Sequence, residues 1–538
     1  MRFQNNRSET EGGGLACIDG ASPSVTYCEF ITNEAGQYGG AVYVSGNTSY
    51  PVITESQFLQ NASNTGNGGA LYIRDSFIMV SFCSFTENTA PRDGGAVYIR
   101  NNQSIISPGN TFTDNRGCGG SDLAAWSASN PEINATSNTF SGSAVTDYYV
   151  MPQNVFNTSG HSSGLTPLTV NLYVAPDGDD ELNDGLSPAS PFRTIRHALS
   201  RLQSGLPALN LTVFAAAGEY SETATGELFP LPSLDGIGIH GAGEGATVIN
   251  SETSTGTFRS LFSHLDRIEN LTLTGSVGPG LYCRDSGIII NHLTFHDYAN
   301  TSYGAGVYID DSDIVIENSS FINCQAAVAG GAIYLDTPGS NIFSCTFTGN
   351  SAVYSGGAIH NKSGNSVVAG CTFNGNVSPA GGAVRIENGS PVFDAGAAGP
   401  NVFADNFSPR GANLSAQSIP AAPFDARDNT YDVSPESAWS VAPSGAFDIS
   451  GYTVTGPPPM MSATVYVAED GNNANDGLTP DTAFRNISYA VKRVVGTETD
   501  PSLIYVGPGV YDEAAGEQFP VSLLPNIHLI GSGFPVTA

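Results

Sequence analysis

The chain repeats one short unit about every 26 residues. The unit reads F-x-x-N, then a short polar gap, then G-G-A followed by an aliphatic residue, Tyr and a second aliphatic residue. The phenylalanines that mark successive copies fall in two runs: Phe3, Phe30, Phe58, Phe85 and Phe112, then Phe295, Phe321, Phe347, Phe373 and Phe403. A fixed period of roughly 20 to 50 residues is typical of solenoids, propellers and related arrays. The sequence therefore predicts a repeat architecture.

The residues within each unit indicate which repeat architecture the chain forms. Each unit holds two or three short stretches that are typical of strands, such as V-I-T-E-S-Q-F and A-V-Y-V, joined by Asn, Gly and Ser. No unit contains the amphipathic stretch that a helical repeat needs. The W-D and L-x-x-L-x-L signatures of propellers and leucine-rich repeats are missing from the sequence. These features predict an all-β chain that forms a parallel β-helix.

The position after the G-G-A and its aliphatic residue indicates which side chains face outward. It holds tyrosine in five copies but also His360 and Arg385, and a position that accepts arginine is expected to face solvent. We therefore expect a surface-exposed aromatic ladder, aligned across coils and suited to a sugar or another flat partner: Tyr43, Tyr72, Tyr98, Tyr308 and Tyr334. On this assignment, Tyr308→Ala and Tyr334→Ala leave the fold intact.

By strand alternation, the aliphatic neighbours of these tyrosines point inward. Each Phe and the residue two before it are also predicted to lie in the core. The Asn of F-x-x-N is expected to cap a turn, because asparagine tolerates left-handed backbone and bonds locally. The glycine pair is expected to allow a bend that no side chain would fit.

Eight cysteines occur, several of them at the predicted inward position before a Phe. Only Cys345 and Cys371 lie in adjacent coils, and neighbouring strands in register are an awkward geometry for a disulfide. We expect the cysteines to act as small buried apolar residues.

The amino-acid composition limits the classes of partner that the chain can bind. Fifty acidic against 19 basic residues give a formal charge of −31, and Lys362 and Lys492 are the only lysines, so a nucleic-acid partner is excluded. No apolar run is long enough for a transmembrane segment, and the amino terminus lacks the apolar core of a signal peptide. The first residues already form an F-x-x-N copy, so we expect the chain to be a segment of a longer protein.

The whole pattern recurs with a period of about 292 residues. This predicts that residues 1–170 are the final coils and closing segment of a first module, and that residues 171–463 are a complete module. In the complete module we expect a head at 171–250, coils at 251–415 and a closing segment at 416–463. Residues 464–538 are then the head of a third module.

Each head contains a short amphipathic stretch, which predicts helices near 191–202 and 483–494. In the first of these, Phe192, Ile195 and Leu199 share one face. We expect that face to cover the first coil of its own array, because the open end of a β-helix exposes backbone and core and therefore needs a cap. Limited bending is expected at 157–170 and 448–463.

The heads also carry oxygen-rich loops. Hard cations prefer such ligands, so the sequence predicts a calcium site in each head, with these ligands: Asp177, Asp179 and Asp184 in the first, Asp470, Asn475 and Asp476 in the second. The alternative is a plain turn, because N-D-G is also a turn signal. No other cofactor is expected.

The F-x-x-N and G-G-A motifs resemble the repeats of the chlamydial polymorphic outer-membrane proteins, of the pectin-lyase-like right-handed parallel β-helix class. The Y-V-A-x-D-G and N-D-G segments of the heads resemble an uncharacterised domain that opens many bacterial and archaeal β-helix surface proteins. The resemblance implies an extracellular or cell-surface protein with an adhesin-like role. The resemblance does not extend to the terminal barrel of the chlamydial proteins, so autotransport is not expected from this segment alone.

Catalysis is the alternative, because pectin-lyase-like folds include polysaccharide lyases and glycoside hydrolases. Asp310, Asp311 and Asp313 are the densest acidic group within a coil, but they occupy a turn whose residues vary between copies. No catalytic residue is therefore assigned. The sequence favours a structural or adhesive role, with neighbouring modules, further copies of the chain or surface glycans as partners.

Overall fold

The computed structural model describes the chain except for these residues: 101–103, 127–132, 144–145, 153–154, 262–263, 276, 394–397, 409, 421, 433–439, 444, 456–460, 492, 495, 497–499, 518–520, 522, 524–525 and 533–538. The side chains of residues 264, 265 and 513 also lie outside the description. The chain forms two compact units, residues 1–300 with 306–319 and residues 301–305 with 320–538. The module boundaries expected from the internal repeat stay predictions.

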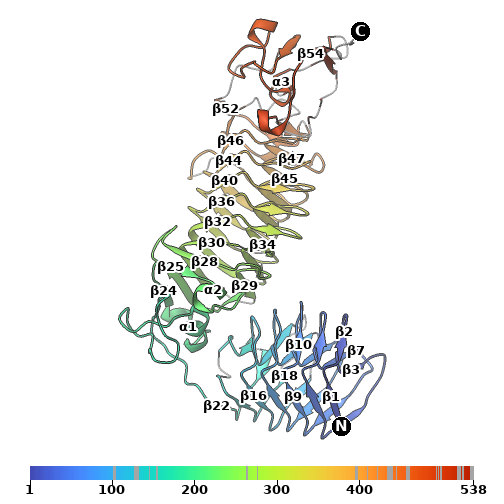
Figure 1. Cartoon of the computed structure of the whole chain (residues 1–538), viewed down its shortest axis with the longest axis vertical. Coiled ribbons are helices and arrows are strands. Elements are labelled where there is room, and N and C mark those ends of the chain that lie inside the picture. Colours follow the sequence, from blue (N-terminus) through green and yellow to red (C-terminus); the bar gives the residue numbers. More distant parts are fainter. Residues whose placement is uncertain are drawn as a thin grey trace. The chain divides into compact units, whose positions relative to one another are not determined.

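The first unit begins with an array of parallel strands (Figure 1). The F-x-x-N segments form one sheet in the order β1-β5-β9-β13-β16-β19-β22. The G-G-A segments form a second, in the order β20-β17-β14-β11-β7-β3, and a third sheet has the order β21-β18-β15-β12-β8-β4. We call the second the ladder sheet. Successive coils thus place equivalent strands side by side, as a parallel β-helix requires.

The bounds of these strands follow the repeat. In the first sheet they are Arg2–Gln4, Glu29–Ile31, Gln57–Leu59, Ser84–Thr86, Thr111–Thr113, Thr139–Phe140 and Ser162–Ser163. In the ladder sheet, from β3 to β20, they are Leu15–Cys17, Val42–Ser45, Leu71–Arg74, Val97–Arg100, Leu123–Trp126 and Val150–Met151. In the third, from β4 to β21, they are Ser24–Thr26, Val52–Thr54, Met79–Ser81, Ile105–Ile106, Ile133–Asn134 and Phe156–Asn157. The short strands β2, β6 and β10 are Arg7–Ser8, Glu34–Ala35 and Ala62–Ser63.

The same unit continues into a head and the coils that follow it. Its helical segments are α1 (Ile195–Arg201), η2 (Pro207–Leu209) and α2 (Glu222–Thr225). Its strands β23 to β29 are Leu172–Val174, Leu211–Ala215, Gly218–Tyr220, Leu231–Ser233, Ile237–Gly241, Thr247–Asn250 and Phe258–Leu261. Its strands β30 to β35 are His264–Thr274, Leu281–Arg284, Gly287–His296, Ala299–Asn300, Val307–Asp310 and Val315–Glu317.

The second unit holds further coils and a second head. Strands β36 to β44 are Ser320–Ile322, Gln325–Ala326, Ile333–Asp336, Asn341–Phe343, Thr346–Thr348, Ser351–Ala352, Ile359–Ser363, Val367–Ala369 and Thr372–Asn374. Strands β45 to β52 are Val384–Ile386, Val402–Ala404, Leu414–Ala416, Phe424–Asp425, Thr430–Tyr431, Val441–Ala442, Phe447–Asp448 and Thr453–Val454. The head has β53 (Val465–Val467), η3 (Pro480–Thr482), α3 (Ile487–Val491), β54 (Ser502–Val506), η4 (Glu513–Ala515) and β55 (Ile527–Gly531). The chain is therefore an all-β parallel solenoid with very little helix.

Stacked phenylalanines fill the core of each array. The strand register pairs each Phe with the Phe of the next coil, as Phe30 with Phe58 and Phe58 with Phe85. Ring centroids along the first array lie between 4.7 and 5.1 Å apart, with near-parallel planes. In the second unit the stack from Phe321 to Tyr431 has spacings of 4.8 to 5.2 Å. The predicted inward position of these rings is confirmed.

The asparagines of F-x-x-N form a buried ladder that runs from coil to coil. The Nδ2 of Asn33 donates to Oδ1 of Asn61, and the Nδ2 of Asn61 donates to Oδ1 of Asn88, both at 2.9 Å. The left-handed backbone falls on the residue before each asparagine, with φ of 49° at Thr32 and 54° at Gln60. The prediction that the asparagine itself takes left-handed backbone and bonds locally was therefore wrong. Its side chain bonds the neighbouring coil, and the preceding residue makes the turn.

The glycine pair acts as the sequence predicted. Gly39 has a φ of +64°, a conformation that L side chains rarely adopt. A Cβ on Gly40 would lie 2.2 Å from the carbonyl oxygen of Gly69 in the next coil, so a side chain cannot fit there.

All eight cysteines are free, and all are buried except the half-buried Cys28. Cys345 and Cys371 lie in neighbouring coils without a disulfide. The expectation that the cysteines act as buried apolar residues is confirmed.

The head helices are shorter than predicted. Helix α1 begins after its N-cap Thr194, whose Oγ1 accepts a hydrogen bond from the backbone N–H of His197. Phe192 lies outside the helix, bridged to Val174, and is buried. Ile195 and Leu199 are buried, and α1 contacts β23, β24 and β26. This is the capping arrangement expected for the first coil of the array.

Two expectations fall partly on residues that the structure does not describe. Position 492, in the predicted second helix, and positions 456–460, in the second predicted bending segment, lie outside the described residues. Among the residues that are described, no helix is long and apolar enough to cross a membrane.

Candidate functional site

The predicted tyrosine ladder exists, but its rings are largely covered. Tyr43, Tyr72 and Tyr98 are register partners in β7, β11 and β14, and their ring centroids are 5.6 and 5.3 Å apart. They form a cluster separate from the main core, together with Tyr38 and Trp126. Only 3%, 2% and 7% of their surfaces are exposed, respectively. The prediction that these three tyrosines are surface-exposed was wrong.

The other two ladder tyrosines differ from each other. Tyr308 is half-buried and stacks on Tyr282 at 5.2 Å. Tyr334 is 5% exposed, because it packs between His360 at 5.2 Å and Tyr303 at 4.6 Å. Exposure was therefore wrongly predicted for Tyr334 as well. The physical reason is shared by both arrays: rings in adjacent coils cover each other, and a second aromatic residue, Tyr38 or Tyr303, covers a ring from the side.

Burial also removes the ladder from acid–base chemistry. Desolvation raises the pKa of Tyr72 to about 12, although the nearby Arg100 lowers it in part. The phenol therefore stays neutral at physiological pH, and the stack serves packing.

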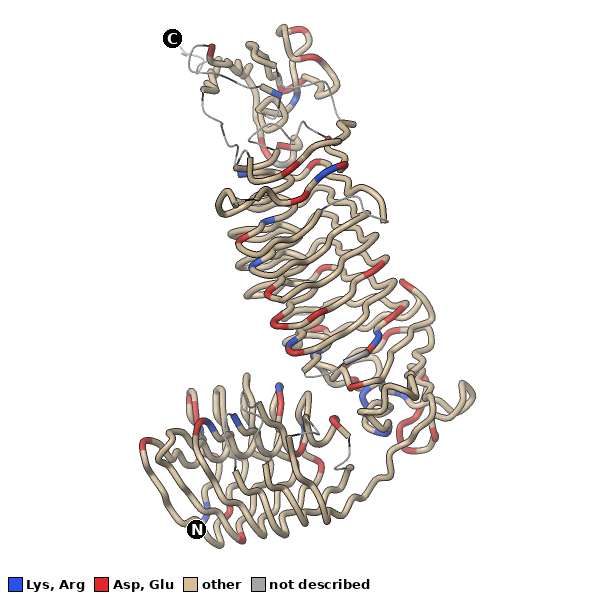
Figure 2. Tube along the Cα trace, turned by 180° about the vertical axis from the view of Figure 1, so that it is seen from behind, with Lys and Arg blue, Asp and Glu red and all other residues tan. Residues whose placement is uncertain are grey.

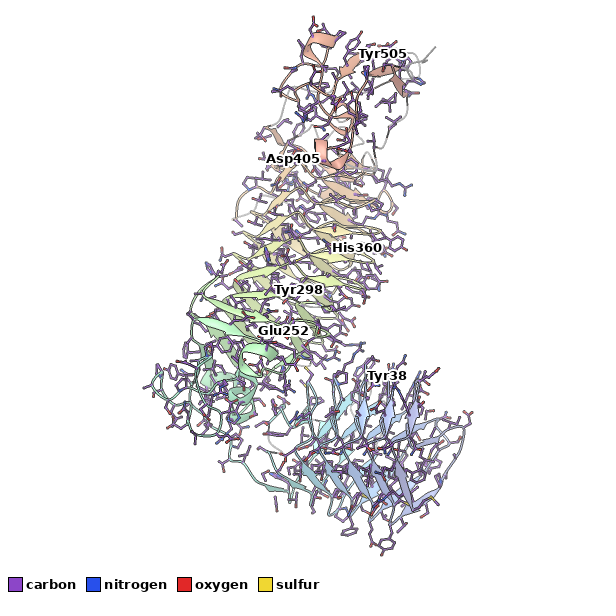
Figure 3. All side chains as sticks on the ribbon, viewed as in Figure 1. Tyr38, Glu252, Tyr298, His360, Asp405 and Tyr505 are labelled. Atoms are coloured by element: carbon purple, nitrogen blue, oxygen red, sulfur yellow. The ribbon has the colours of Figure 1, made fainter. Side chains whose placement is uncertain are left out.

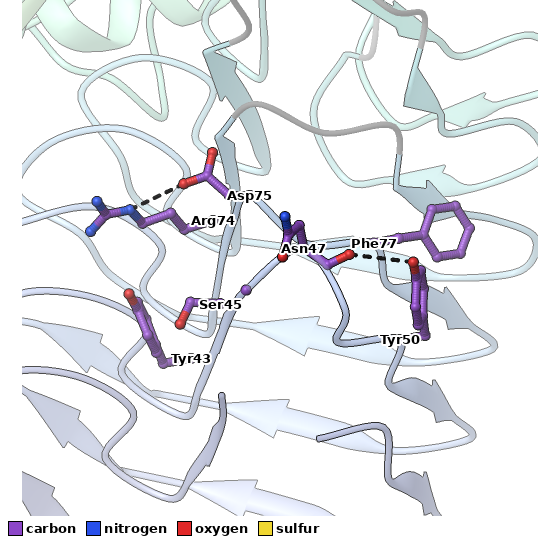
Figure 4. Close-up of a pocket in the computed structure, with 8 residues that line it drawn as sticks. Tyr43, Ser45, Asn47, Tyr50, Arg74, Asp75 and Phe77 are labelled. Atoms are coloured by element: carbon purple, nitrogen blue, oxygen red, sulfur yellow. Dashed lines mark hydrogen bonds and ion pairs between the residues drawn. The ribbon is translucent and has the colours of Figure 1, made fainter. Parts of the chain in front are cut away.

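A cavity of about 830 Å³ lies beside the ladder sheet, where β7 and β11 end (Figure 4). We call it the aromatic groove. Its lining comes from the ends of these strands and the turns that follow: Tyr43, Ser45, Gly46, Asn47, Tyr50, Arg74, Asp75 and Phe77. Tyr43 is the one member that the sequence singled out.

The groove combines aromatic faces with hydrogen-bonding groups. Tyr50 is 55% exposed, and its ring centroid lies 6.3 Å from that of Phe77. Its hydroxyl donates to the carbonyl oxygen of Asn47 at 3.3 Å. Nε of Arg74 lies 3.4 Å from Oδ2 of Asp75, and about half of each side chain is exposed. Sequence reasoning missed Tyr50 and Phe77, although an aromatic residue follows the ladder strand in both coils.

The first head uses its acidic residues to hold turns. Oδ1 of Asp179 accepts hydrogen bonds from the backbone N–H groups of Glu181 and Leu182, both at 2.9 Å, and these bonds lower the pKa of Asp179. Oδ1 of Asp184 accepts from the backbone N–H two residues further on, at 3.1 Å. Asp177 is exposed.

The second head repeats this pattern. Oδ1 of Asp476 accepts from the backbone N–H of Leu478 at 3.0 Å, and Nδ2 of Asn475 donates to the carbonyl oxygen of Ala483 at 3.1 Å. Asp470 is exposed. Across the described part of the chain, no three His, Cys, Asp or Glu side chains come together as metal ligands. The calcium sites stay predictions, and the structure accounts for most of their expected ligands as turn-forming groups.

A neighbouring position shows that this role does not need a charge. Asp180 accepts hydrogen bonds from the backbone N–H groups of the two residues before α1, at 2.7 and 3.1 Å. In the second head Asn473 accepts from the two residues before α3, at 2.9 and 3.1 Å. The amide oxygen of Asn473 thus accepts the same two backbone hydrogen bonds as the carboxylate of Asp180.

A buried glutamate completes the start of each helix, and sequence reasoning missed it. Glu227 accepts from the backbone N–H groups of Ile195 and Arg196 at 2.7 and 3.1 Å. Glu517 accepts from the first two residues of α3 at 2.7 and 2.8 Å. Both belong to the recurring G-E-x-F-P segment, so that recurrence was the available signal. Burial raises the pKa of Glu227 to about 7.

Acidic residues are spread over the turns of the coils, with basic residues among them (Figure 2). Arg284, for example, lies 3.3 Å from Asp310, a member of the acidic group considered for catalysis. Asp310 is therefore paired with a cation.

Comparisons with known proteins agree with the fold. Residues 236–407 match a family model described as a right handed beta helix region. Residues 82–100 match the Chlamydia polymorphic membrane protein repeat. Residues 469–534, in the second head, match a family described as a protein of unknown function.

One curated relative and one solved structure add context. A stretch of 95 residues is 33% identical to the probable autotransporter YfaL of Escherichia coli (strain K12), and this match covers 16% of the chain and 8% of that relative. A mutant of the PL6 family alginate lyase AlyGC is 10% identical, with a TM-score of 0.27, over 84% of this chain and 82% of that one. A likeness at that TM-score carries no argument about function.

Proposed function

We propose that this chain, a parallel β-helix with polymorphic-membrane-protein repeats, is part of a cell-surface protein with an adhesive role, and that its aromatic groove binds a saccharide. Two comparisons support the surface setting, the match to a polymorphic membrane protein repeat and the similarity to a probable autotransporter. The chain aligns with 8% of the length of that relative. The role of the whole protein is therefore part of the proposal.

The observation that carries the adhesive role is the pairing of ring faces with polar groups in one groove. The rings of Tyr50 and Phe77 can stack against the apolar face of a sugar ring. Aromatic side chains that are partly exposed to solvent are suited to such a contact. Asn47, Arg74 and Asp75 offer donors and acceptors for hydroxyl groups. Ligand sites commonly combine apolar walls with a few polar groups that fix orientation.

The charge of the groove indicates whether a neutral or a charged saccharide would bind. Arg74 is the one cation among its eight lining residues, and it is paired with Asp75. The formal charge of the chain, −31, repels polyanions. We therefore propose a neutral oligosaccharide, such as a hexose or N-acetylhexosamine chain.

A glycan array tests the groove directly, followed by calorimetry with the best neutral oligosaccharide. Tyr50→Ala and Phe77→Ala should each weaken binding by about tenfold or more, which corresponds to about 1.4 kcal/mol. Tyr354→Ala is the matched control, because it removes another exposed tyrosine, 64% exposed and outside the groove. Binding that survives the double variant Tyr50→Ala/Phe77→Ala would refute the groove as the site.

The same binding reaction distinguishes adhesion from the catalytic alternative. An adhesin returns the oligosaccharide at its original length after overnight incubation, as measured by mass spectrometry. A polysaccharide lyase or glycoside hydrolase would shorten it. Surface display is tested separately by treating intact cells of the source organism with a protease. Peptides of this chain should be released into the medium before a cytoplasmic marker appears.

A further inference from the structure

One coil of the second unit departs from the repeat at three consecutive positions. Where the preceding coil has Tyr334, Leu335 and Asp336, strand β42 has His360, then Asn361 and Lys362. The register shifts here, because Asp336 pairs with Ser363 and not with Lys362. Such irregularities re-aim side chains and are common beside functional sites. This coil is therefore where a function distinct from packing is expected.

The imidazole of His360 lies between a hydroxyl and a carboxylate. Its Nδ1 is 2.9 Å from Oγ of Ser355, and its Nε2 is 3.3 Å from Oε2 of Glu387. The ring stacks on Tyr334 with centroids 5.2 Å apart and planes 4° from parallel. Figure 3 labels His360 among the side chains of the second unit. Packing and hydrogen bonding together fix the orientation of the ring.

These contacts assign the tautomer. A carboxylate only accepts hydrogen bonds, so Nε2 of His360 carries the proton that it donates to Glu387. Nδ1 then holds a lone pair, and the hydroxyl of Ser355 donates to it. A serine that donates to a histidine, which is itself oriented by a carboxylate, is the arrangement that activates a nucleophile.

We propose that Ser355 is a nucleophile that attacks carboxylic esters, with His360 as its general base and Glu387 as the residue that positions His360. This activity is separate from saccharide binding in the groove, and neither depends on the other.

The approach to Ser355 is open. The residue is half-buried, and the two residues before it, Val353 and Tyr354, are 57% and 64% exposed. Both precede Ser355 directly in the chain, and on this proposal they contact the acyl chain or the alcohol of the ester.

The reaction balances with water as the second substrate. Oγ of Ser355 forms a bond to the carbonyl carbon while its proton passes to Nδ1 of His360. The bond between that carbon and the alkoxy oxygen breaks, and the departing alkoxide takes the proton from His360. Water then attacks the acyl-serine with the same base, which releases the carboxylic acid and restores Ser355.

The electrostatic surroundings keep the base available. Burial is the main reason that the pKa of His360 lies below its ordinary value of 6.5. Arg385 and Lys362 lower it further, and Glu387 opposes them. The ring is therefore neutral at neutral pH and able to accept the proton of Ser355.

Two probes test the proposal on the whole chain. A fluorophosphonate should label Ser355, located by mass spectrometry of the digested protein, and p-nitrophenyl acetate should be hydrolysed with turnover. Ser355→Ala should abolish both signals. His360→Phe, which retains a ring to stack on Tyr334, should lower the rate by about 100-fold or more. Ser363→Ala is the matched control, because Ser363 lies in the same coil but donates to Asp336 at 2.7 Å.

A pH profile separates positioning from mere structure. The wild-type rate should rise with pH through a midpoint below 6.5. Glu387→Gln should lower the rate and move the midpoint further down, because Glu387 raises the pKa of His360. No labelling of the folded wild-type chain, or equal labelling of Ser355→Ala, would overturn the proposal. A midpoint unchanged in Glu387→Gln would overturn the role of Glu387.

Discussion

Asp122 and Asn413 perform the same task at the end of two asparagine ladders. Nδ2 of Asn115 donates to Oδ1 of Asp122 at 2.9 Å, and Nδ2 of Asn406 donates to Oδ1 of Asn413 at 3.1 Å. Both acceptors are 1% exposed. The difference lies in the second polar atom: Asn413 donates onward to Ser440 at 3.0 Å, whereas Oδ2 of Asp122 has no hydrogen-bond partner among the described atoms.

Asp122→Asn should therefore stabilise the first array at alkaline pH. Burial raises the pKa of Asp122 from 3.8 to about 7, so the folded state binds more protons than the unfolded state between these values. Stability is then lost as the pH rises through this window. The substitution removes the ionisable group. Near pH 8 the free energy of unfolding should therefore increase by about 1–3 kcal/mol, measured as a higher urea midpoint. The gain should disappear near pH 4.

Asn413→Asp is the reciprocal control, and it should destabilise the second array near pH 8 by a similar amount. If both substitutions shift the urea midpoint in the same direction, the comparison between the two ladder ends is incorrect.

Glu227→Ala should loosen the start of helix α1. The variant removes two hydrogen bonds between backbone N–H groups and the carboxylate, one of them buried and one partly buried, and a hydrogen bond to a charged group contributes about 1.5–3 kcal/mol. Hydrogen exchange should accelerate at Ile195 and Arg196. Glu222→Ala, an exposed glutamate of α2, is the control and should leave that exchange unchanged. Unaltered protection at Ile195 in Glu227→Ala would show that other contacts hold the helix.

Tyr72→Ala should destabilise the first array by about 2–4 kcal/mol, because it opens a cavity between stacked rings. Tyr334→Ala should also destabilise its array, which revises the expectation from sequence that it leaves the fold intact. Tyr308→Ala should reduce the stability less than the other two substitutions, since Tyr308 is half-buried. Thermal unfolding followed by circular dichroism measures the melting temperature of each variant. Equal losses at Tyr72 and Tyr308 would mean that burial does not set the cost.

The calcium prediction can be tested with the chain as it stands. Because Asp184 and Asp476 bond backbone N–H groups of their own turns, removing divalent ions with EDTA should leave the melting temperature unchanged. A melting temperature that rises with added Ca²⁺, and no longer does so in Asp184→Asn, would instead support the site expected from the sequence.

The repeat made the core predictable, because its period equals the distance between register partners. Phe30, Phe58 and Phe85 recur at the interval that places them side by side, so their stacking followed from spacing alone. The asparagine ladder did not follow from spacing alone, because the residues of one coil indicate only the turn chemistry within that coil. The hydrogen-bond partner of Asn61 lies 27 residues away.

The candidate sites were less visible for a related reason. Within a single coil, a histidine at position 360 indicates exposure to solvent. The side chains that it contacts, Ser355 and Glu387, occupy other positions of the repeat. Tyr43 was expected to be exposed because arginine occurs at the same position in another coil. Cover from a neighbouring ring such as Tyr72 depends on coil stacking, which single-coil patterns do not show.

The close approach at the glycine pair limits which positions of each coil can change during evolution. With Gly40 against the carbonyl of Gly69, that corner of the coil admits no side chain, and the stacked Phe opposite tolerates little variation. The ladder position between them is covered by neighbouring rings, and it holds tyrosine, histidine or arginine in different coils of this chain. Substitutions at the ladder position can therefore accumulate one coil at a time, while the glycine corner and the phenylalanine stack preserve the fold.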